Sequence, residues 1–421
     1  MIELVTEKKS NGKKLSLEDC YLVVDSLLKN KLSNNNLKFF LALASFGMEK
    51  EEVLNMALAI RDSGRVLSFN QCILEKHSTG GVADSSSVAL IPLVASLGFK
   101  VIKMSGKSLV YTNGSADRFG AIANFNVLLS DDEIKRSIEK TNACVLSHNG
   151  DICPADRIIF DIIEKCGLES DINILAMSIA AKKLASGPKM VLVDVKFGRE
   201  TIIKTYKQAK RLAHLLRYIF KQCKVESTIV ITNANQTISS SIGNGIEVVE
   251  ALEVLRGKKC PLREVVSTFA LEMVSKVEPI LSNPQILDNI NDSLDNGKAY
   301  KTFLDIVRVQ GGDVKAVENG SLFRPVHFKN FVATKDGYVG NISSQMLGEL
   351  VRRMCKLTHD PNVGVRLYVR IGDYVHAGDK ILTFYYKNEQ DFERYKEAIA
   401  GSVRLTHLNI KKIKVIKKVL R

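Results

Sequence analysis

The feature that most constrains the fold is an alternation of apolar runs and amphipathic segments between residues 66 and 240. The runs QCILEKHS, KVIKMSG, ACVLSH, MVLVDVKFG and STIVITNAN have the length and the residue types of buried strands. Segments of helical character separate them. Strands that alternate with helices pair in parallel through right-handed crossovers, so the sequence predicts a mostly parallel central sheet.

Two other blocks of the sequence are typical of helices, and the last third is rich in turns. Ser16 and Asp19 resemble a capping box at the start of one helix, and the following amphipathic segments stop at Gly47 and Gly64. The segments GYVGNI and VRLYVRIGDYVHAGDKILTFYY indicate short strands. We therefore expect an α/β chain: an all-helical domain, a large α/β domain with a mostly parallel central sheet, and a β-rich C-terminal unit.

The order of these segments predicts that the chain crosses twice between the helical and the α/β domains. The expected boundaries are 1–65 and 153–187 for the helical domain, 66–152 and 188–330 for the α/β domain, and 331–421 for the C-terminal unit.

Composition excludes several classes of protein. The net charge of the 421-residue chain is +14, yet seven of its basic residues follow Gly401 and no helix-turn-helix or zinc-finger pattern accompanies them. No apolar run is long enough for a bilayer, the first residues are charged, and eight cysteines lie without metal-ligand spacing. We expect a cytoplasmic protein with no nucleic-acid or membrane partner.

The segment Lys76–Ser87, KHSTGGVADSSS, carries the strongest chemical signal. A glycine pair between a strand and a helix lets backbone N–H groups approach an anion, and a lysine and several hydroxyls add donors for phosphate. The segment contains neither GxxxxGK[ST] nor GxGxxG. The simpler interpretation is a glycine turn with a serine N-cap.

A second segment of this kind, Lys103–Ser115, also follows a strand and carries lysines and hydroxyls. Loops from neighbouring strands meet at the carboxyl edge of a parallel sheet, where α/β proteins place ligands. The pair of loops favours an anion site more strongly than either loop alone.

Lys76–Gly81 and several later segments together resemble the thymidine and pyrimidine-nucleoside phosphorylases. The KHSTGG signature, Asp84, PADR, SIAAKKLASG, VDVKFG and GNGIEVVEAL occur in order and with similar spacing along nearly the whole chain. The resemblance implies a helical domain, a phosphate-binding α/β domain, a homodimer, nucleoside and phosphate as small-molecule partners, and no organic cofactor. It implies the reaction of thymidine and inorganic phosphate, as co-substrate, to thymine and 2-deoxyribose 1-phosphate.

The resemblance also assigns site residues. The catalytic positions are His77 and Lys182, and Ser178, Lys182 and Leu109 would bind the nucleoside. The phosphate ligands would be Lys76, Ser78, Ser87, Lys103, Ser105 and Ser115. One branch of the family binds potassium, and the matching positions are Ala83, Ser85, Ile238, Ser241 and Glu250.

Three departures from the family pattern fall in the part that holds the base. The family arginine of a YxxRD segment corresponds to Ile163, the loop arginine is Lys107, and a glycine-rich GSGAF is replaced by 198–202. Lys107 and Arg199 are the candidates to compensate. One alternative is a degenerate homologue that binds phosphate or nucleoside with little turnover. Another is phosphoribosyl transfer, which needs a metal-chelating carboxylate pair that the glycine loops lack.

Overall fold

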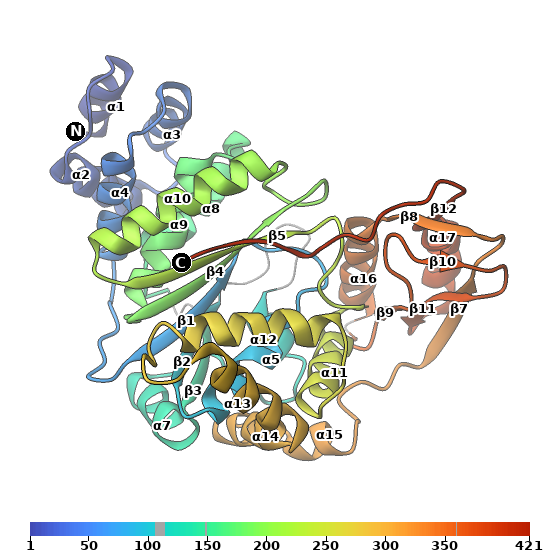
Figure 1. The fold of residues 1–421 in the computed structure, drawn as a ribbon. Helices are drawn as coiled ribbons and strands as arrows, with labels where there is room; N and C mark the ends of the chain where they lie inside the picture. The colour runs from blue at the N-terminus through green and yellow to red at the C-terminus, as the bar shows by residue number, and fades with distance from the viewer. Residues whose placement is uncertain (106–113, 148–149, 359) are drawn as a thin grey trace.

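The computed structural model describes residues 1–105, 114–147, 150–358 and 360–421. Its centre is a six-stranded sheet in the order β13-β5-β4-β1-β2-β3, parallel except for β13 (Figure 1). The mostly parallel sheet predicted from the sequence is confirmed. Its strands are β1 (Ile73–Ser78), β2 (Lys100–Ser105), β3 (Ala143–Ser147), β4 (Met190–Phe197), β5 (Glu226–Asn233) and β13 (Ile416–Leu420).

One face of the sheet packs on the helical domain and α10. Helices α1 to α4 precede the first strand, and α8 and α9 come from the second helical segment (Figure 1). These helices and one face of the sheet share a continuous apolar core. Their bounds are α1 (Ile2–Ser10), α2 (Leu17–Asn30), α3 (Asn34–Phe46), α4 (Lys50–Arg61), α8 (Pro154–Cys166), α9 (Ile172–Ala185) and α10 (Tyr206–Gln222).

A second core fills the opposite face of the sheet, where α5, α11, α12, α13 and α14 pack. The helices on this side and at the β3 edge are α5 (Ser86–Ser96), α6 (Ser115–Phe119), α7 (Asp131–Thr141), α11 (Asn244–Leu255), α12 (Pro261–Val274), α13 (Asn283–Asp295), α14 (Lys298–Val309) and α15 (Val314–Glu318). Because both faces of the sheet are covered, its central strands read as continuous apolar runs, and every residue of β4 except Phe197 is buried.

Side-chain caps begin many of the helices. Ser16 Oγ accepts from the backbone N–H of Asp19 and the Asp19 carboxylate accepts from that of Ser16, so the predicted capping box is present. Ser130 forms the same motif with Glu133 at the start of α7. Within the described ranges, no helix combines the length and the apolarity that crossing a bilayer requires.

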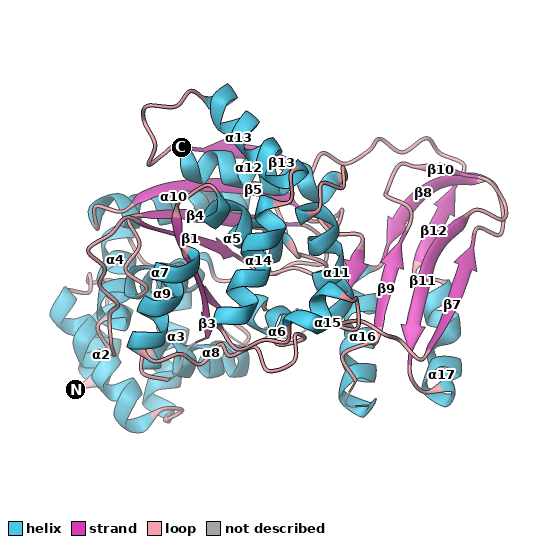
Figure 2. Cartoon of the chain, turned by 90° about the horizontal axis from the view of Figure 1, so that it is seen from below, coloured by secondary structure: helices cyan, strands magenta, loops and turns pink. Residues whose placement is uncertain are grey.

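The C-terminal unit contains two small antiparallel sheets and two helices (Figure 2). The sheet orders are β10-β8-β12 and β6-β9-β11-β7. Since β6 precedes α11 in the chain, this strand joins the unit to the α/β domain. The elements are β6 (Ser241–Ile242), β7 (His327–Val332), β8 (Gly337–Ile342), α16 (Ser344–Thr358), β9 (Gly364–Leu367), β10 (Tyr374–Val375), β11 (Lys380–Tyr386), α17 (Glu389–Ala400) and β12 (Val403–Thr406).

The end of the chain differs from the sequence-based domain 331–421. Instead of staying in the C-terminal unit, β13 returns to the central sheet and pairs antiparallel with β5. Arg421 then forms an ion pair with Glu272 of α12, with 2.6 Å between Nη2 and Oε1. The basic character of this segment suits an edge strand, because its exposed Lys417 and Lys418 oppose pairing with a further strand.

Candidate active site

Strand β1 distributes its side chains to the two faces of the sheet. Ile73 belongs to the core shared with the helical domain, and Leu74 belongs to the core on the opposite face. Because side chains alternate along a strand, Glu75 and His77 face the helical domain, and Lys76 faces α5. One strand therefore supplies groups to both halves of the predicted site.

Lys76 lies fully buried at the start of α5. Its Nζ donates to Ser86 Oγ at 3.0 Å and to Ser87 Oγ at 3.1 Å. The connecting loop requires glycine, since Gly80 and Gly81 have φ values of 89° and 151°. The loop thus folds back so that the strand lysine meets two hydroxyls at the start of the helix.

Asp84 balances the charge of this lysine. Its Oδ2 lies 3.6 Å from Lys76 Nζ and 3.3 Å from Lys196 Nζ, and it accepts from Ser78 Oγ at 3.1 Å. Burial alone would raise the pKa of Asp84, but Lys196, Lys76 and Arg118 hold it well below the usual range. Burial lowers the pKa of Lys76, although Asp84 and Asp194 oppose this. An arriving dianion would stabilise the charged lysine.

The described start of the second predicted segment, Lys103 to Ser105, lies beside β1. Lys103 Nζ donates to the backbone carbonyl of Lys76 at 2.8 Å, and burial, followed by Lys183 and Lys76, lowers the pKa of Lys103 well below its ordinary value. Ser105 Oγ accepts from the Ala116 backbone N–H at 3.3 Å, in the helix that begins with Ser115. The predicted Leu109 and the compensating Lys107 lie outside the described residues.

On the helical side, Ser178 and Lys182 stand one turn apart on α9, and a single carboxylate holds both. Ser178 Oγ donates to Asp156 Oδ1 at 2.5 Å, and Lys182 Nζ donates to Asp156 Oδ2 at 2.8 Å and to Ser178 Oγ at 3.0 Å. Lys182 Nζ also lies 4.2 Å from the centroid of the Phe160 ring. No role was assigned to Asp156 from the sequence. Ser178 and Lys182 are four residues apart on one helix, and such residues are near enough to share one partner, here Asp156.

His77 is half-buried and surrounded by positive charge. Burial lowers the pKa of its imidazole well below the ordinary value, and Lys183, Lys103, Lys182 and Lys76 act in the same direction. These lysines belong to both halves of the site, so His77 lies within the field of each. It is a neutral imidazole at physiological pH and can donate a hydrogen bond through one N–H.

A buried ion pair ties the two halves together. Lys183 of α9 pairs with Glu75 of β1 and donates to the backbone carbonyl of Met104 at 3.0 Å, and Ser186 also donates to Glu75. The helix that carries Ser178 and Lys182 is therefore fixed to the strand that carries Lys76 and His77.

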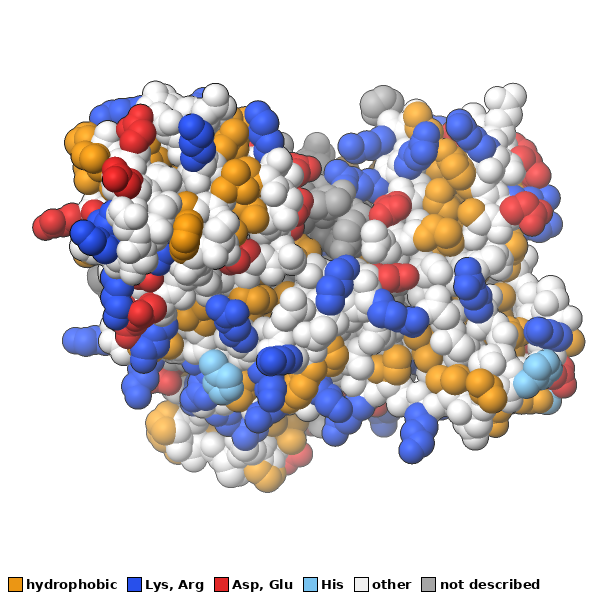
Figure 3. All heavy atoms as spheres, turned by 90° about the horizontal axis from the view of Figure 1, so that it is seen from above, with side chains coloured by type: hydrophobic (Ala, Val, Ile, Leu, Met, Phe, Trp, Pro, Cys, Tyr) orange, Lys and Arg blue, Asp and Glu red, His pale blue; other side chains and the backbone are white. Residues whose placement is uncertain are grey.

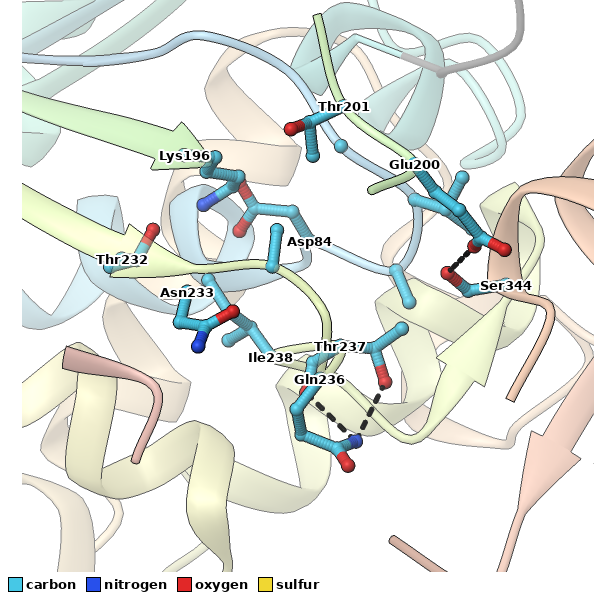
Figure 4. A pocket seen from close by; sticks show the side chains of 14 residues that line it. Asp84, Lys196, Glu200, Thr201, Thr232, Asn233, Gln236, Thr237, Ile238 and Ser344 are labelled. Atoms are coloured by element: carbon cyan, nitrogen blue, oxygen red, sulfur yellow. Dashed lines mark hydrogen bonds and ion pairs between the residues drawn. The ribbon is translucent and has the colours of Figure 1, made fainter. Parts of the chain in front are cut away.

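A small cavity of about 10 Å³, roughly the room of one water molecule, lies behind the glycine loop (Figure 4). Lys196 and Asp84 lie near each other at one side of it, and Glu200 lies beside Ser344 at another. Glu200 accepts from Ser344 Oγ at 2.7 Å and from the Gln345 N–H at 2.8 Å, so it caps α16. Among the predicted site residues that the structure describes, Ala83 and Ile238 line this cavity.

Arg199 does not replace the missing base arginine. Its Nη2 donates to Asn341 Oδ1 in β8 at 2.7 Å, so its guanidinium points to the C-terminal unit. Ile163 is 2% exposed and belongs to the core shared with the helical domain. It stands seven residues after Asp156 on α8, hence on the same helix face and about 10 Å further along.

The fold and site define an α/β protein with buried lysines and serine hydroxyls at the carboxyl edge of a parallel sheet, next to a lysine and a serine of a helical domain. Residues 70–300 match the model of the glycosyl transferase family, a/b domain. The chain is 31% identical to the pyrimidine-nucleoside phosphorylase of Staphylococcus epidermidis (strain ATCC 12228 / FDA PCI 1200), over 91% of this chain and 92% of that protein. It is 29% identical to the thymidine phosphorylase of Agrobacterium fabrum (strain C58 / ATCC 33970), over 93% and 92% of the two chains. The chain belongs to this family of pyrimidine-nucleoside and thymidine phosphorylases.

The fold also resembles a solved structure outside these phosphorylases. Anthranilate phosphoribosyltransferase from Thermus thermophilus matches with a TM-score of 0.59 and 17% identity, over 73% of this chain and 99% of that one. At this identity the likeness concerns the fold alone.

The lowered pKa of His77 makes the stability of the protein depend on pH. The folded protein keeps His77 neutral, whereas the unfolded chain takes up a proton below about pH 6.5, so stability falls as pH falls. We expect the wild type to lose up to about 1.4 kcal/mol per pH unit relative to His77→Gln between about pH 6.5 and pH 5. Urea unfolding at a series of pH values measures this. His214→Gln, at an exposed position of α10, is the matched control. If the free energy of unfolding changed with pH in the same way for wild type and His77→Gln, the lowered pKa of His77 would be disproved.

The burial of Ile163 predicts that Ile163→Arg destabilises the protein. An uncompensated buried charge costs roughly 3–5 kcal/mol, so we expect a lower melting temperature than that of Asp161→Arg, an exposed position on the same helix. Normal melting of Ile163→Arg would instead mean that this position opens into the base pocket.

Proposed function

We propose that this protein cleaves pyrimidine nucleosides with inorganic phosphate, converting thymidine and phosphate to thymine and 2-deoxyribose 1-phosphate. The observation that carries the proposal is Lys76, which is fully buried and bonded to two hydroxyls beside a glycine loop. The names of the bacterial relatives support the same reaction.

The reaction exchanges one bond for another at the anomeric carbon. A phosphate oxygen bonds to C1′ while the bond from C1′ to the pyrimidine nitrogen breaks, and the electron pair of that bond moves into the base. The sugar carries positive charge in the transition state. Lys76, Lys103 and the hydroxyls of Ser87 and Ser105 hold the phosphate near this carbon, so their contribution is positioning.

The departing base needs donors for the negative charge that it gains. Lys182 and Ser178 supply a cation and a hydroxyl, and Asp156 fixes both in place. His77 donates as a neutral group, because the surrounding lysines disfavour its imidazolium. A donor of this kind contributes about 2.7–4 kcal/mol to transition-state stabilisation.

A second candidate function is binding of phosphate or nucleoside with little turnover. The observation that favours it is Ile163, whose apolar side chain cannot donate to a base oxygen. Release of free base from thymidine and uridine, with and without phosphate, distinguishes the two functions.

The proposal includes a cytoplasmic homodimer. Helices α1 to α3 expose large apolar side chains, and hydrophobic groups are visible at this end of the molecule in Figure 3. Such a surface suits a second copy of the chain. The exposed apolar residues of these helices and the loops between and after them include Leu4, Leu17, Tyr21, Leu22, Leu28, Leu32, Leu41 and Phe46. The eight unpaired cysteines favour a reducing compartment.

The function is tested by Lys76→Met, which keeps a long side chain and removes its charge. We expect phosphate-dependent release of thymine to fall by roughly 10²–10³, the effect of losing one charge-stabilising donor. Lys221→Met, an exposed position on α10, should keep full activity. A Lys76→Met enzyme that is as active as wild type at saturating phosphate would refute the assignment, and an inactive wild type would favour the binding function.

The Asp156 contacts predict a separate effect on the nucleoside. In Asp156→Asn the fixed partner of Lys182 loses its charge, and hydrogen bonds to charged groups contribute about 1.5–3 kcal/mol. We expect kcat/KM for thymidine to fall roughly 10- to 100-fold while KM for phosphate stays the same. Asp161→Asn on the same helix is the control. Equal losses for both substrates would indicate a general structural defect instead.

A further inference from the structure

The side chain of Arg366 enters the cluster for which the resemblance implies a potassium ion. It extends from β9, and its side chain is 16% exposed. Nη1 donates to Ser241 Oγ at 2.9 Å, and Nη2 donates to Glu253 Oε2 at 2.7 Å. Nη1 also lies 3.9 Å from Glu250 Oε2. Two of the five predicted potassium ligands, Ser241 and Glu250, therefore already face a guanidinium.

The remaining positions do not complete a site around those two. Ala83 and Ile238 line the cavity behind the glycine loop, and Glu250 and Ser241 do not (Figure 4). The Ala83 carbonyl accepts from the Ser239 N–H at 3.0 Å, and Ser85 Oγ lies 2.5 Å from Ser239 Oγ. A potassium ion about 4 Å from the Arg366 guanidinium would be repelled by about 4 kcal/mol at an effective dielectric constant of 20. The residues present do not fit a potassium ion.

We infer that Arg366 replaces the potassium ion in this chain, as a covalently attached cation opposite Glu250. Glu250 is buried, and among the described residues its Oε2 accepts no hydrogen bond, so the carboxylate needs a positive charge nearby. Arg366 and Ser241 are directly paired in the sheet of the C-terminal unit, which fixes the guanidinium at this place.

The contacts continue from Arg366 to the phosphate loop. Glu250 Oε1 accepts from the Ser240 N–H at 2.8 Å, next to Ser241. Ser239 in turn donates to the backbone carbonyl of Ala83 and accepts from the N–H of Ser85. Ser85 directly precedes Ser86 and Ser87, which bond Lys76. Arg366 is therefore a positioning residue: it orders the segment 239–241, which holds the loop.

Burial disfavours the charged form of Arg366, but Glu250 and Glu253 more than offset this and raise its pKa. The guanidinium is therefore charged at every pH at which the protein is folded. A charge that is part of the chain does not depend on the ion content of the solution.

Thermal unfolding in potassium chloride and in tetramethylammonium chloride of equal ionic strength tests the inference. An ion that binds only the folded state raises the melting temperature. We expect the wild type to melt at the same temperature in both salts. Arg366→Met should melt at a lower temperature in tetramethylammonium and should regain several degrees in potassium, because the vacated charge can then be supplied by the ion.

Two variants complete the experiment. Arg366→Lys keeps a charge and should remain indifferent to potassium, and Arg404→Met, an exposed position on β12, should behave as wild type. A potassium-specific rise in the wild type would overturn the inference, and so would an Arg366→Met protein that gains nothing from potassium. The wild-type comparison stands even where Arg366→Met does not fold. The inference goes beyond the proposed reaction, and melting does not depend on whether the protein cleaves nucleosides.

Discussion

The alternation of side chains along β1 is the constraint on which both halves of the site depend. Glu75 and His77 face the helical domain, and Lys76 between them faces α5. A shift of the strand by one residue would exchange these faces and place Lys76 against the helical domain. Parallel pairing with β2 and β4 on either side prevents such a shift, because both neighbours are buried on both faces. The register of the sheet therefore decides which groups meet each substrate.

The same strand lies among an unusual number of buried charges. Lys76, Lys103, Lys183 and Lys196 are all buried, and Glu75, Asp84 and Asp194 are buried among them. Isolated buried charges are very unfavourable, so each carboxylate is placed against at least one lysine. Burial lowers the pKa of Lys76 and of Lys103, and for Lys103 the neighbouring Lys183 and Lys76 lower it further. A dianion bound at the glycine loop, as proposed, would favour the charged form of both lysines, so its binding would stabilise this region.

The sequence predicts those parts of the fold and of the site that short, continuous segments encode. The strands and the glycine loop are encoded within short segments, and KHSTGG by itself places Lys76 and His77 at the end of a strand. Asp156 and Arg366 could not be assigned in this way. Their roles depend on partners 22 and 125 residues away, Ser178 and Ser241, which only the packing of α8 on α9 and of β9 on β6 brings close. The return of β13 to the central sheet escaped prediction for the same reason, since a basic tail carries no signal for its distant partner strand.

Two positions around the site differ in the charge that they carry. At Ile163 the chain lacks the cation that the family pattern places on the base side, while Arg366 supplies a cation next to Glu250. Loss of the first leaves Lys182 as the charged group that Asp156 fixes on the base side. Asp156 neutralises part of that charge, and in the proposed mechanism a pyrimidine oxygen and this carboxylate share the ammonium group. Its three hydrogens allow both contacts at once, since Asp156 and Ser178 take two and the third remains for a ligand. In the proposed mechanism the base side therefore depends on the fixed position of Lys182, which the hydrogen bonds between α8 and α9 provide.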